Sequence, residues 1–373
     1  MKAVFDREAL ASAFQLTGSV VPTRTPKVIL QNVKLSVTKK QAVLKATDLE
    51  SVGITMEVRG VQVEEPGDIL LPTGRVNSIL RECTDEEIKI EGNEDGTTIR
   101  GQFSEFDLPG ENPDQYPTVT GFDTDKYHSI ASGKLKEMIH RTIFAAASES
   151  ARYALTGVLW ELNEEKVRLV ATDGKRMAVV DGHGEAHNGH ATGSTTPVVP
   201  TKVMQLVEKN LSVSEDPVYV RISTNDALFK IGGAEIYGRL VEGRYPSYRE
   251  VFPKKTVVKI PLMVGPLTSV IRQAAILTDE DTRGVDFHFA KGTLTLNAKV
   301  AEKGRAKIEL PVAYDAKPMT TTFDPKLVLD MLRVLEPDTE INLELVENNS
   351  VALFTAPGNY SYIVVPLTRG EGR

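Results

Sequence analysis

The feature of this 373-residue chain that most constrains its fold is an internal threefold similarity. Asp48 in KATDLE and Asp173 in VATDGKRM lie about 125 residues apart, and the related segment LTLNAKV (294–300) follows at about the same interval. Solenoid repeats are much shorter, roughly 20–45 residues. The similarity therefore predicts three tandem domains rather than a solenoid.

The expected order of elements is the same in each third of the chain. Apolar residues at three- and four-residue spacing predict a first helix, alternating residues then predict a hairpin, and a second helix and hairpin follow. The expected helices are 6–21, 133–147 and 264–278, and, after a proline or Asp-Pro start, 71–83, 199–211 and 323–335. The expected hairpins are 28–47, 156–172 and 284–300, and 87–103, 217–233 and 340–356.

This order predicts an α+β fold in which two helices per domain cover one side of antiparallel sheets. We expect domain boundaries at 1–124, 125–253 and 254–373, near the Pro- and Asp-rich stretch 108–126 and the turn-rich stretch 242–255. Head-to-tail domains either extend as an array or close into a ring. Closure is the more economical interpretation, and it would give a hole lined by helices.

Composition sets few further limits on function. Hydrophobic residues make up 41% and charged residues 25%, which is typical of folded globular proteins. The charged opening MKAVFDREAL does not suit a signal peptide, so we expect a cytoplasmic protein. Cys83 is the only cysteine, which excludes an intrachain disulfide and thiolate metal clusters. The net charge of −7 argues against nucleic acid only if the basic residues are spread evenly.

The expected helices carry basic residues that a DNA-facing surface would need, although acidic residues share the same helices. The basic residues are Arg75, Arg81, Lys136, His140, Arg141, Lys202, Lys209, Arg272, Lys326 and Arg333. The acidic residues are Glu82, Glu137, Glu208 and Asp330. On the pattern alone, a solvated face of mixed charge is an equal alternative.

Three stretches resemble one known family: ATDGKRMAV (171–179), LVEGRYPSYREVFP (240–253) and YSYIVVPLTR (360–369). Together, and at this spacing, they resemble the bacterial β sliding clamp, the processivity subunit of DNA polymerase III. The resemblance extends over essentially the whole chain. It implies three clamp domains per chain and a head-to-tail homodimer that forms a six-domain ring, with helices lining the hole. It also implies a protein that is not an enzyme and needs no cofactor.

The resemblance further implies an apolar pocket that receives short linear peptides from partner proteins. The matching residues are Leu155, Thr172, Gly174, Lys175, Arg176, Met177, Pro246, Val251, Ile363, Val365, Pro366 and Leu367. Such a pocket is the kind of site that concentrates binding energy on a few anchors. Without the resemblance, ATDGKR reads as a strand with an Asp-Gly turn and IVVPL as a C-terminal strand.

The chain departs from the family pattern beside this pocket. Glu250 occupies a position that is often basic, and Thr368 and Arg369 replace a basic-then-apolar ending, followed by the extra residues 370–373. Because of these changes, the sequence does not predict which peptide residues the rim of the pocket prefers.

For duplex DNA, the resemblance points to loop residues Arg24 and Tyr153, the latter in SESARY (148–153). Glu149 in that loop replaces a neutral amide and would repel phosphate. With these we count Arg75, Arg81, Arg141 and Lys202 as DNA-contacting residues. The contacts would be independent of base sequence, because a sliding tether cannot hold particular bases.

The family resemblance implies several partners besides DNA. They are the catalytic subunit of DNA polymerase III, an ATP-driven clamp loader, and other polymerases and repair proteins that bind through peptides. Two alternatives stay open from the sequence. One is a peptide-binding scaffold that does not bind DNA, and the other is a metal-dependent hydrolase using His183, His187 and His190.

Overall fold

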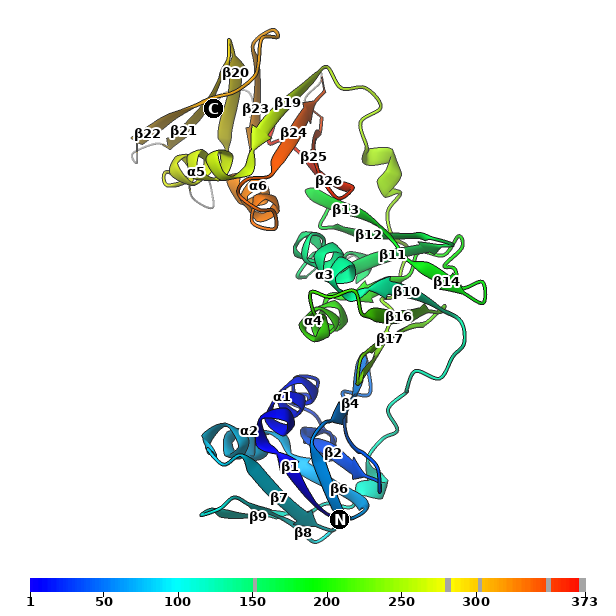
Figure 1. Cartoon of the computed structure of the whole chain (residues 1–373). Coiled ribbons are helices and arrows are strands. Elements are labelled where there is room, and N and C mark those ends of the chain that lie inside the picture. Colours follow the sequence, from blue (N-terminus) through cyan, green and yellow to red (C-terminus); the bar gives the residue numbers. More distant parts are fainter. Residues whose placement is uncertain (150–152, 279–282, 301–303, 347–349, 369–373) are drawn as a thin grey trace. The chain divides into compact units, whose positions relative to one another are not determined.

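The computed structural model describes residues 1–149, 153–278, 283–300, 304–346 and 350–368 (Figure 1). The chain folds into two compact units, and each is described by itself. Unit 1 contains Met1–Gly133, Glu185–Ala191 and Lys202–Leu240, and unit 2 contains Lys134–Gly184, Thr192–Thr201 and the chain from Val241 onward.

One order of elements, strand, helix and three strands, recurs six times in the described part of the chain. Copies 1 and 2 are β1 (Lys2–Asp6), α1 (Arg7–Gly18), β2 (Asn32–Val37), β3 (Ala42–Thr47) and β4 (Val52–Val58), then β6 (Gly67–Pro72), α2 (Thr73–Glu82), β7 (Glu87–Gly92), β8 (Gly96–Arg100) and β9 (Glu105–Pro109). Copies 3 and 4 are β10 (Tyr127–Ala131), α3 (Ser132–His140), β11 (Gly157–Asn163), β12 (Lys166–Thr172) and β13 (Arg176–His183), then β15 (Val198–Pro200), α4 (Thr201–Asn210), β16 (Pro217–Ile222), β17 (Asp226–Ile231) and β18 (Ala234–Arg239). Copies 5 and 6 are β19 (Val258–Met263), α5 (Val264–Ala275), β20 (Val285–Ala290), β21 (Thr293–Val300) and β22 (Gly304–Pro311), then β23 (Met319–Phe323), α6 (Pro325–Leu332), β24 (Glu340–Leu345), β25 (Ala352–Ala356) and β26 (Tyr360–Val364). The short strands β5 (Val61–Glu65) and β14 (Glu185–His187) stand outside this order.

The first strand of each copy pairs with the other copy of the same third of the chain. β1 pairs with β7 and β6 with β2. The same exchange joins β10 to β16, β15 to β11, β19 to β24 and β23 to β20. All these pairings are antiparallel, so the two copies in each third depend on each other for a complete sheet.

The fourth strands of the copies join different thirds of the chain. β4 pairs with β18 to make the nine-stranded sheet of unit 1, and β13 pairs with β26 to make the eight-stranded sheet of unit 2. The other two fourth strands, β9 and β22, end the five-stranded and four-stranded sheets. These two sheets continue across the expected domain boundaries. The middle third of the chain is therefore divided, with one part in each unit.

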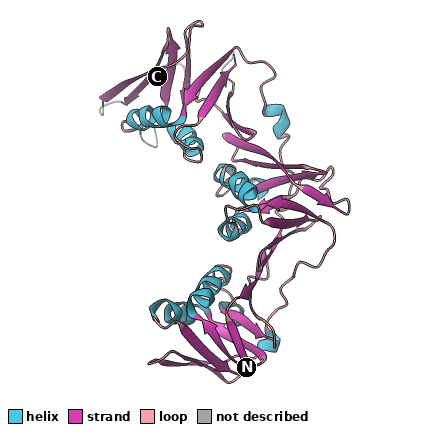
Figure 2. Ribbon diagram, viewed as in Figure 1, coloured by secondary structure: helices cyan, strands magenta, loops and turns pink. Residues whose placement is uncertain are grey.

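The helices follow from the spacing of apolar residues. α1 buries Leu10, Ala13, Phe14 and Thr17, and it begins where the Asp6 carboxylate accepts the amide hydrogen of Ala9 at 2.7 Å. α1 packs against α2 and α5 against α6, and within each unit the helices lie against the sheets (Figure 2). At the α1–α2 contact, a Cβ on Gly18 would lie 2.9 Å from the Thr73 methyl group, so any larger residue would require the Thr73 side chain to move. The expected α+β fold with antiparallel sheets is confirmed.

Some boundaries differ from the sequence-based expectation. α3 ends at His140 instead of residue 147, and Ile143–Ala145 form a short 3₁₀ helix. The buried hydroxyl of Thr142 donates to the carbonyl of Met138 at 2.8 Å, a local bond that competes with further helix. The first strand of each copy was not predicted, and Pro72 stands at the N-cap of α2 rather than inside its first turn. In the described residues, no helix is long and apolar enough to cross a membrane.

Unit 1 contains a buried pair of histidines. The Nδ1 atoms of His128 on β10 and His190 are 2.7 Å apart, so one ring donates and the other accepts. Nε2 of His190 lies 3.1 Å from the amide nitrogen of Ile222 and 3.2 Å from its carbonyl oxygen, so it accepts from the first or donates to the second according to the tautomer. Burial, assisted by the charge of Arg221, lowers the pKa of His190, although its backbone contact with Ile222 acts in the opposite direction.

This pair predicts that unit 1 loses stability in mild acid. A His whose pKa is lowered by folding contributes stability that is complete above its unfolded value, about 6.5, and is lost as the pH falls toward the lower folded value. We expect the free energy of unfolding to fall by at most about 1.4 kcal/mol per pH unit in that range. Urea denaturation between pH 7.5 and 5 measures this.

The variant His190→Gln should have a flatter pH dependence than the wild type. His183→Gln is the matched control, because His183 is exposed. If His190→Gln and the wild type lose stability in parallel, the histidine pair does not cause the pH dependence.

Candidate functional site

An apolar cluster in unit 2 brings together three of the residues predicted for the peptide pocket, Leu155, Met177 and Ile363. They come from a 3₁₀ helix, from β13 and from β26, so the β13–β26 pairing puts them side by side. The remaining members are Ala147, Ala154, Leu159, Val170, Val179, Val198, Tyr245 and Tyr248. Met177 is 3% exposed and Leu155 is 6% exposed. The cluster is therefore a well-packed apolar floor.

Two tyrosines fix the segment that follows β18 onto this cluster. The hydroxyl of Tyr245 donates to the carbonyl of Val170 at 3.2 Å, and that of Tyr248 donates to the Glu161 carboxylate at 2.9 Å. Burial raises the pKa of both phenols, so both hydroxyls stay protonated donors. The segment, which includes Pro246 and Val251, is thereby held beside the cluster, against which Phe252 also packs.

The turn between β12 and β13 is closed by its own hydrogen bonds. The Asp173 carboxylate accepts the amide hydrogens of Lys175 and Arg176, at 2.9 and 3.0 Å. The Thr172 hydroxyl donates to the carbonyl of Arg176 at 2.6 Å. Gly174 has φ +89°, a left-handed conformation that favours glycine. This turn is a rigid support for Met177, and Lys175 is exposed on it.

The C-terminal residues predicted for the pocket separate into two environments. Ile363 belongs to the cluster, whereas Val365 and Leu367 are about 40% exposed. The amide of Val365 donates to the carbonyl of Lys175 at 2.9 Å, and that of Leu367 to Thr322 at 2.8 Å. Pro366 between them is buried. Residues 369–373, which include the Arg369 of the sequence prediction, lie outside the described residues.

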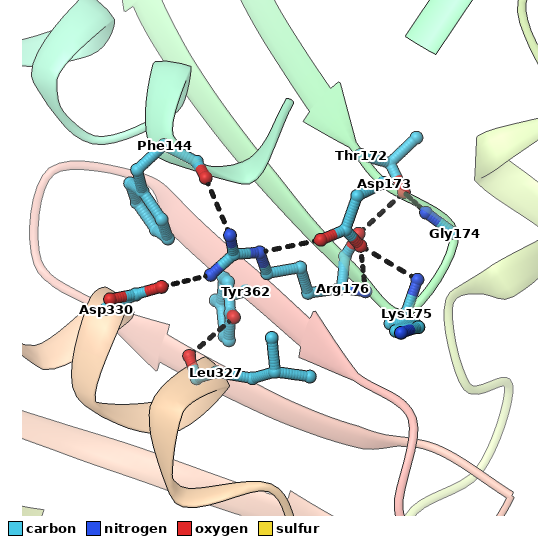
Figure 3. A network of polar contacts seen from close by, with 9 residues as sticks. All are labelled: Phe144, Thr172, Asp173, Gly174, Lys175, Arg176, Leu327, Asp330 and Tyr362. Atoms are coloured by element: carbon cyan, nitrogen blue, oxygen red, sulfur yellow. Dashed lines mark hydrogen bonds and ion pairs between the residues drawn. The ribbon is translucent and has the colours of Figure 1, made fainter. Parts of the chain in front are cut away.

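Arg176 does not point toward the cluster. Side chains of adjacent strand residues point to opposite faces of a sheet, and Met177 faces the cluster. The Arg176 guanidinium donates to Asp173 at 3.0 Å, to Asp330 on α6 at 2.6 Å and to the carbonyl of Phe144 at 2.9 Å (Figure 3). Burial alone would lower its pKa, but the bond to Asp330 and the nearby acidic groups raise it. Arg176 is thus a charged link between β13 and α6.

The residues predicted to contact DNA differ in their surroundings. Arg24 and Arg75 are exposed, and Arg81 is exposed beside Glu82. Lys202 lies 3.0 Å from the Asp48 carboxylate. Arg141 is more engaged, because it pairs with Glu137 at 2.7 Å and donates to the carbonyl of Pro357 at 2.9 Å.

The loop 148–153 is only partly visible. Residues 150–152 lie outside the described residues, as does the side chain of Tyr153, whose backbone begins a 3₁₀ helix. The prediction that this loop contacts DNA stays a prediction.

The three histidines of the proposed metal loop do not converge. His183 is exposed, His187 stacks on Tyr127 with ring centres 4.5 Å apart, and His190 is buried against His128. Among the described residues, no group of three His, Cys, Asp or Glu side chains is arranged to hold a metal ion. The metal-dependent hydrolase therefore has no structural support in the part of the chain described.

Three family models match consecutive parts of the chain. The N-terminal domain of the DNA polymerase III beta subunit matches residues 1–120, its central domain 129–247 and its C-terminal domain 249–368. The beta sliding clamp of Pseudomonas putida KT2440 is 30% identical over 375 residues, covering 98% of this chain and 100% of that protein. The chain belongs to the beta sliding clamp family. The resemblance inferred from its motifs is confirmed, and its function is that of a DNA sliding clamp, a processivity subunit without catalytic activity.

Other beta sliding clamps are similar over the same length. The Escherichia coli K12 protein is 28% identical over 372 residues, covering 98% of this chain and 100% of that protein. The crystal structure of the Pseudomonas aeruginosa clamp bound to griselimycin has a TM-score of 0.92 at 28% identity, covering 99% of this chain and 100% of that one. The Bartonella birtlesii clamp bound to griselimycin has a TM-score of 0.90 at 26% identity over the same shares.

Sequence reasoning missed several residues that shape this site in the clamp. Asp330 appeared only as an unfavourable charge on an expected helix, yet it holds Arg176. Tyr245 and Tyr248 were quoted within a motif but assigned no role. The sequence did contain a signal for the role of the tyrosines. The run Tyr-Pro-Ser-Tyr combines aromatic residues with turn residues, which is typical of a non-regular segment that packs on a sheet.

The link between Arg176 and Asp330 predicts a specific loss of stability. Both side chains are at most 15% exposed, so Asp330→Asn leaves a poorly compensated guanidinium. We expect the free energy of unfolding of unit 2 to fall by about 1–3 kcal/mol in denaturant titrations.

Arg333→Gln is the matched control, because it removes the solvent-exposed arginine that pairs with the same Asp330 carboxylate. The Arg333 side chain is 73% exposed and lies 3.6 Å from Asp330. Its removal should change stability by less than about 0.5 kcal/mol. Equal losses of unfolding free energy in the two variants would show that the buried Arg176–Asp330 pair contributes no more to stability than the exposed pair.

Proposed function

We propose that this clamp encircles duplex DNA as a head-to-tail homodimer, slides along it without reading its sequence, and tethers replication and repair proteins to it through peptides. The partners are the catalytic subunit of DNA polymerase III, other polymerases and repair proteins, and an ATP-driven loader that opens the ring in the cytoplasm. Each chain would contribute three domains, 1–124, 125–253 and 254–373. The observation that carries the proposal is the pairing of the fourth strands.

The fourth strands follow one rule. β4 of copy 1 pairs with β18 of copy 4, and β13 of copy 3 pairs with β26 of copy 6, so the first half of one domain joins the second half of the next. By the same rule, β22 of copy 5 needs the second half of a further domain, and β9 of copy 2 needs the first half of a preceding one. A second chain supplies both. Head-to-tail contacts of this kind close a ring when the rotation permits.

The two edges are complementary in net charge. β9 carries Glu105 and Asp107 with the exposed Phe106, and β22 carries Arg305, Lys307 and Glu309, of which Lys307 and Glu309 pair at 2.6 Å. Phe103, 93% exposed, precedes β9, and Ile276, 78% exposed, follows α5, which packs on β22. Unpaired apolar edges favour aggregation unless a partner covers them. Their pairing in a dimer would satisfy the backbone groups and cover these side chains.

The DNA contacts we propose are few and solvated. Arg24 and Arg75 are exposed, so they can meet phosphates at little cost in lost protein contacts, and Arg81, 74% exposed, would release only its solvent-exposed pair with Glu82. Arg141 and Lys202 would have to exchange the partners they hold, which makes them weaker candidates. Tyr153 completes the proposed set. Retention on DNA would come from the closed ring, since a net charge of −7 does not favour tight phosphate binding.

We propose that partner peptides insert apolar side chains over the cluster formed by Leu155, Met177 and Ile363. Thr172, Gly174, Lys175, Pro246, Val251, Val365, Pro366 and Leu367 would form the surround, and Arg176 would act from behind the strand. Met177 is flexible and polarisable, so it can move to admit different anchors. The griselimycin complexes of similar clamps support a ligand-binding site in this fold.

The proposal predicts that topology holds the clamp on DNA. After loading onto nicked circular DNA, the protein should stay with the circle during gel filtration at about 0.15 M salt and be lost once the circle is cut. Equal loss from circular and linear DNA would contradict a closed ring.

The edge variant Phe106→Asp should be monomeric in sedimentation and should not be retained on the circle. Val213→Asp is the matched control, because Val213 is 89% exposed in the loop after α4. A fully retained Phe106→Asp dimer would place the subunit contact elsewhere.

The pocket proposal predicts that the double variant Met177→Ala, Leu367→Ala binds partner peptides about 10- to 100-fold more weakly while remaining a dimer, because anchor contacts carry most of the binding energy. Fluorescence anisotropy of a labelled peptide with apolar anchors measures the affinity. Val257→Ala, an exposed apolar position in unit 2, is the control. Unchanged affinity in the double variant would remove the pocket assignment.

A further inference from the structure

A cleft of about 710 Å³ in unit 2 lies between the linker 250–255 and residues that follow β24 and precede β25. The linker supplies Glu250, Val251, Phe252, Pro253, Lys254 and Lys255. Val346, Ser350 and Val351 line the other side. The cleft is open to solvent, unlike the buried floor at Met177.

The cleft continues outward from the apolar cluster. Phe252 and Val351 line the cleft and also pack against the cluster, so an apolar path runs from one to the other. Val251, 42% exposed, lies beside Phe252 on the linker. A peptide anchored over the cluster would therefore extend its flanking residues into this cleft.

The linker 250–255 begins with an acidic residue and ends with two basic residues. Glu250 stands next to the tyrosine-fixed segment, and Lys254 and Lys255 stand four and five residues further along. Both lysines are exposed. In the part of the chain that the structure describes, neither lysine forms an ion pair, whereas nearby Arg249 is held by Glu161 at 2.6 Å and Arg168 by Asp181 at 2.7 Å. Within the described residues, which leave out 347–349, the two lysines are thus exposed cations that a ligand can contact.

We propose that this cleft reads the flank of partner peptides and selects an acidic segment next to the apolar anchors. Carboxylates on the peptide would pair with Lys254 and Lys255, and Glu250 would repel them from the other end. The preference would fix the direction in which the peptide lies along the linker. The inference rests on the proposed peptide site, and it assigns to that site a specificity that the apolar anchors cannot supply.

The experiment uses peptides with one apolar core and a flank of three residues that are acidic, amide or basic, placed on either side of the core. Anisotropy titrations with the full-length dimer should show one acidic-flank peptide binding about 3- to 10-fold more tightly than its amide counterpart at low salt. The basic flank should bind most weakly. About 0.5 M salt should remove the difference, since exposed ion pairs are screened.

The double variant Lys254→Glu, Lys255→Glu should reverse the order and favour the basic flank, while the amide-flank peptide keeps its affinity. Lys39→Glu, Lys40→Glu is the matched control, because it reverses two adjacent exposed lysines in the β2–β3 turn of unit 1 and changes the net charge equally. Glu250→Gln should increase the preference for the acidic flank.

Three outcomes decide between the proposals. Equal affinity of the wild type for acidic and amide flanks overturns the specificity while leaving the peptide site intact. The same change in the Lys39, Lys40 control as in the cleft variant also overturns it, because the effect would then come from net charge. Failure of the wild type to bind any peptide with the apolar core defeats the peptide site, and the specificity with it.

Discussion

The structure depends on hydrogen bonding between the edges of neighbouring sheets. A sheet edge exposes a row of backbone donors and acceptors that must find partners. This chain satisfies two such edges internally, at β4–β18 and β13–β26, and so converts separate domains into continuous sheets. A strand pairing fixes direction and register together, so each joint constrains the geometry of the next domain more closely than a flexible linker would. The tethering function that we propose needs that rigidity.

Much of the fold could be predicted from the sequence, because the spacing of apolar residues within short segments indicates its helices and hairpins. Leu10, Ala13 and Phe14 mark one helical face, and the alternation in 28–47 marks a hairpin, of which the structure forms β2 and β3 as strands and Val28–Gln31 as a 3₁₀ helix. The first strands of the copies escaped prediction, because strands such as β1 are short and pair with residues far along the chain. Their identity depends on tertiary contacts that no local pattern contains.

The site was predicted in part, and the gap has a clear physical origin. Leu155, Met177 and Ile363 meet as expected, but Arg176 turns to the opposite face, as strand alternation requires of a neighbour of Met177. A family motif gives consecutive positions without saying which side each serves. Similarly, a count of basic residues on helices does not distinguish Arg75, which is exposed, from Arg141, which holds Glu137 and the carbonyl of Pro357.

The exchange of first strands has a consequence for biosynthesis. β1 lies between β5 and β7, with Lys2 opposite Glu65 on one side and Glu91 on the other, so the N-terminal strand is paired on both edges only after Glu91 has left the ribosome. Loop closure over that distance costs entropy before any contact compensates for it, and non-local topologies fold slowly for this reason. During synthesis, the N-terminal strand therefore stays unpaired and exposed to solvent until its partner strands have been made. Each domain becomes stable only when both of its halves are complete.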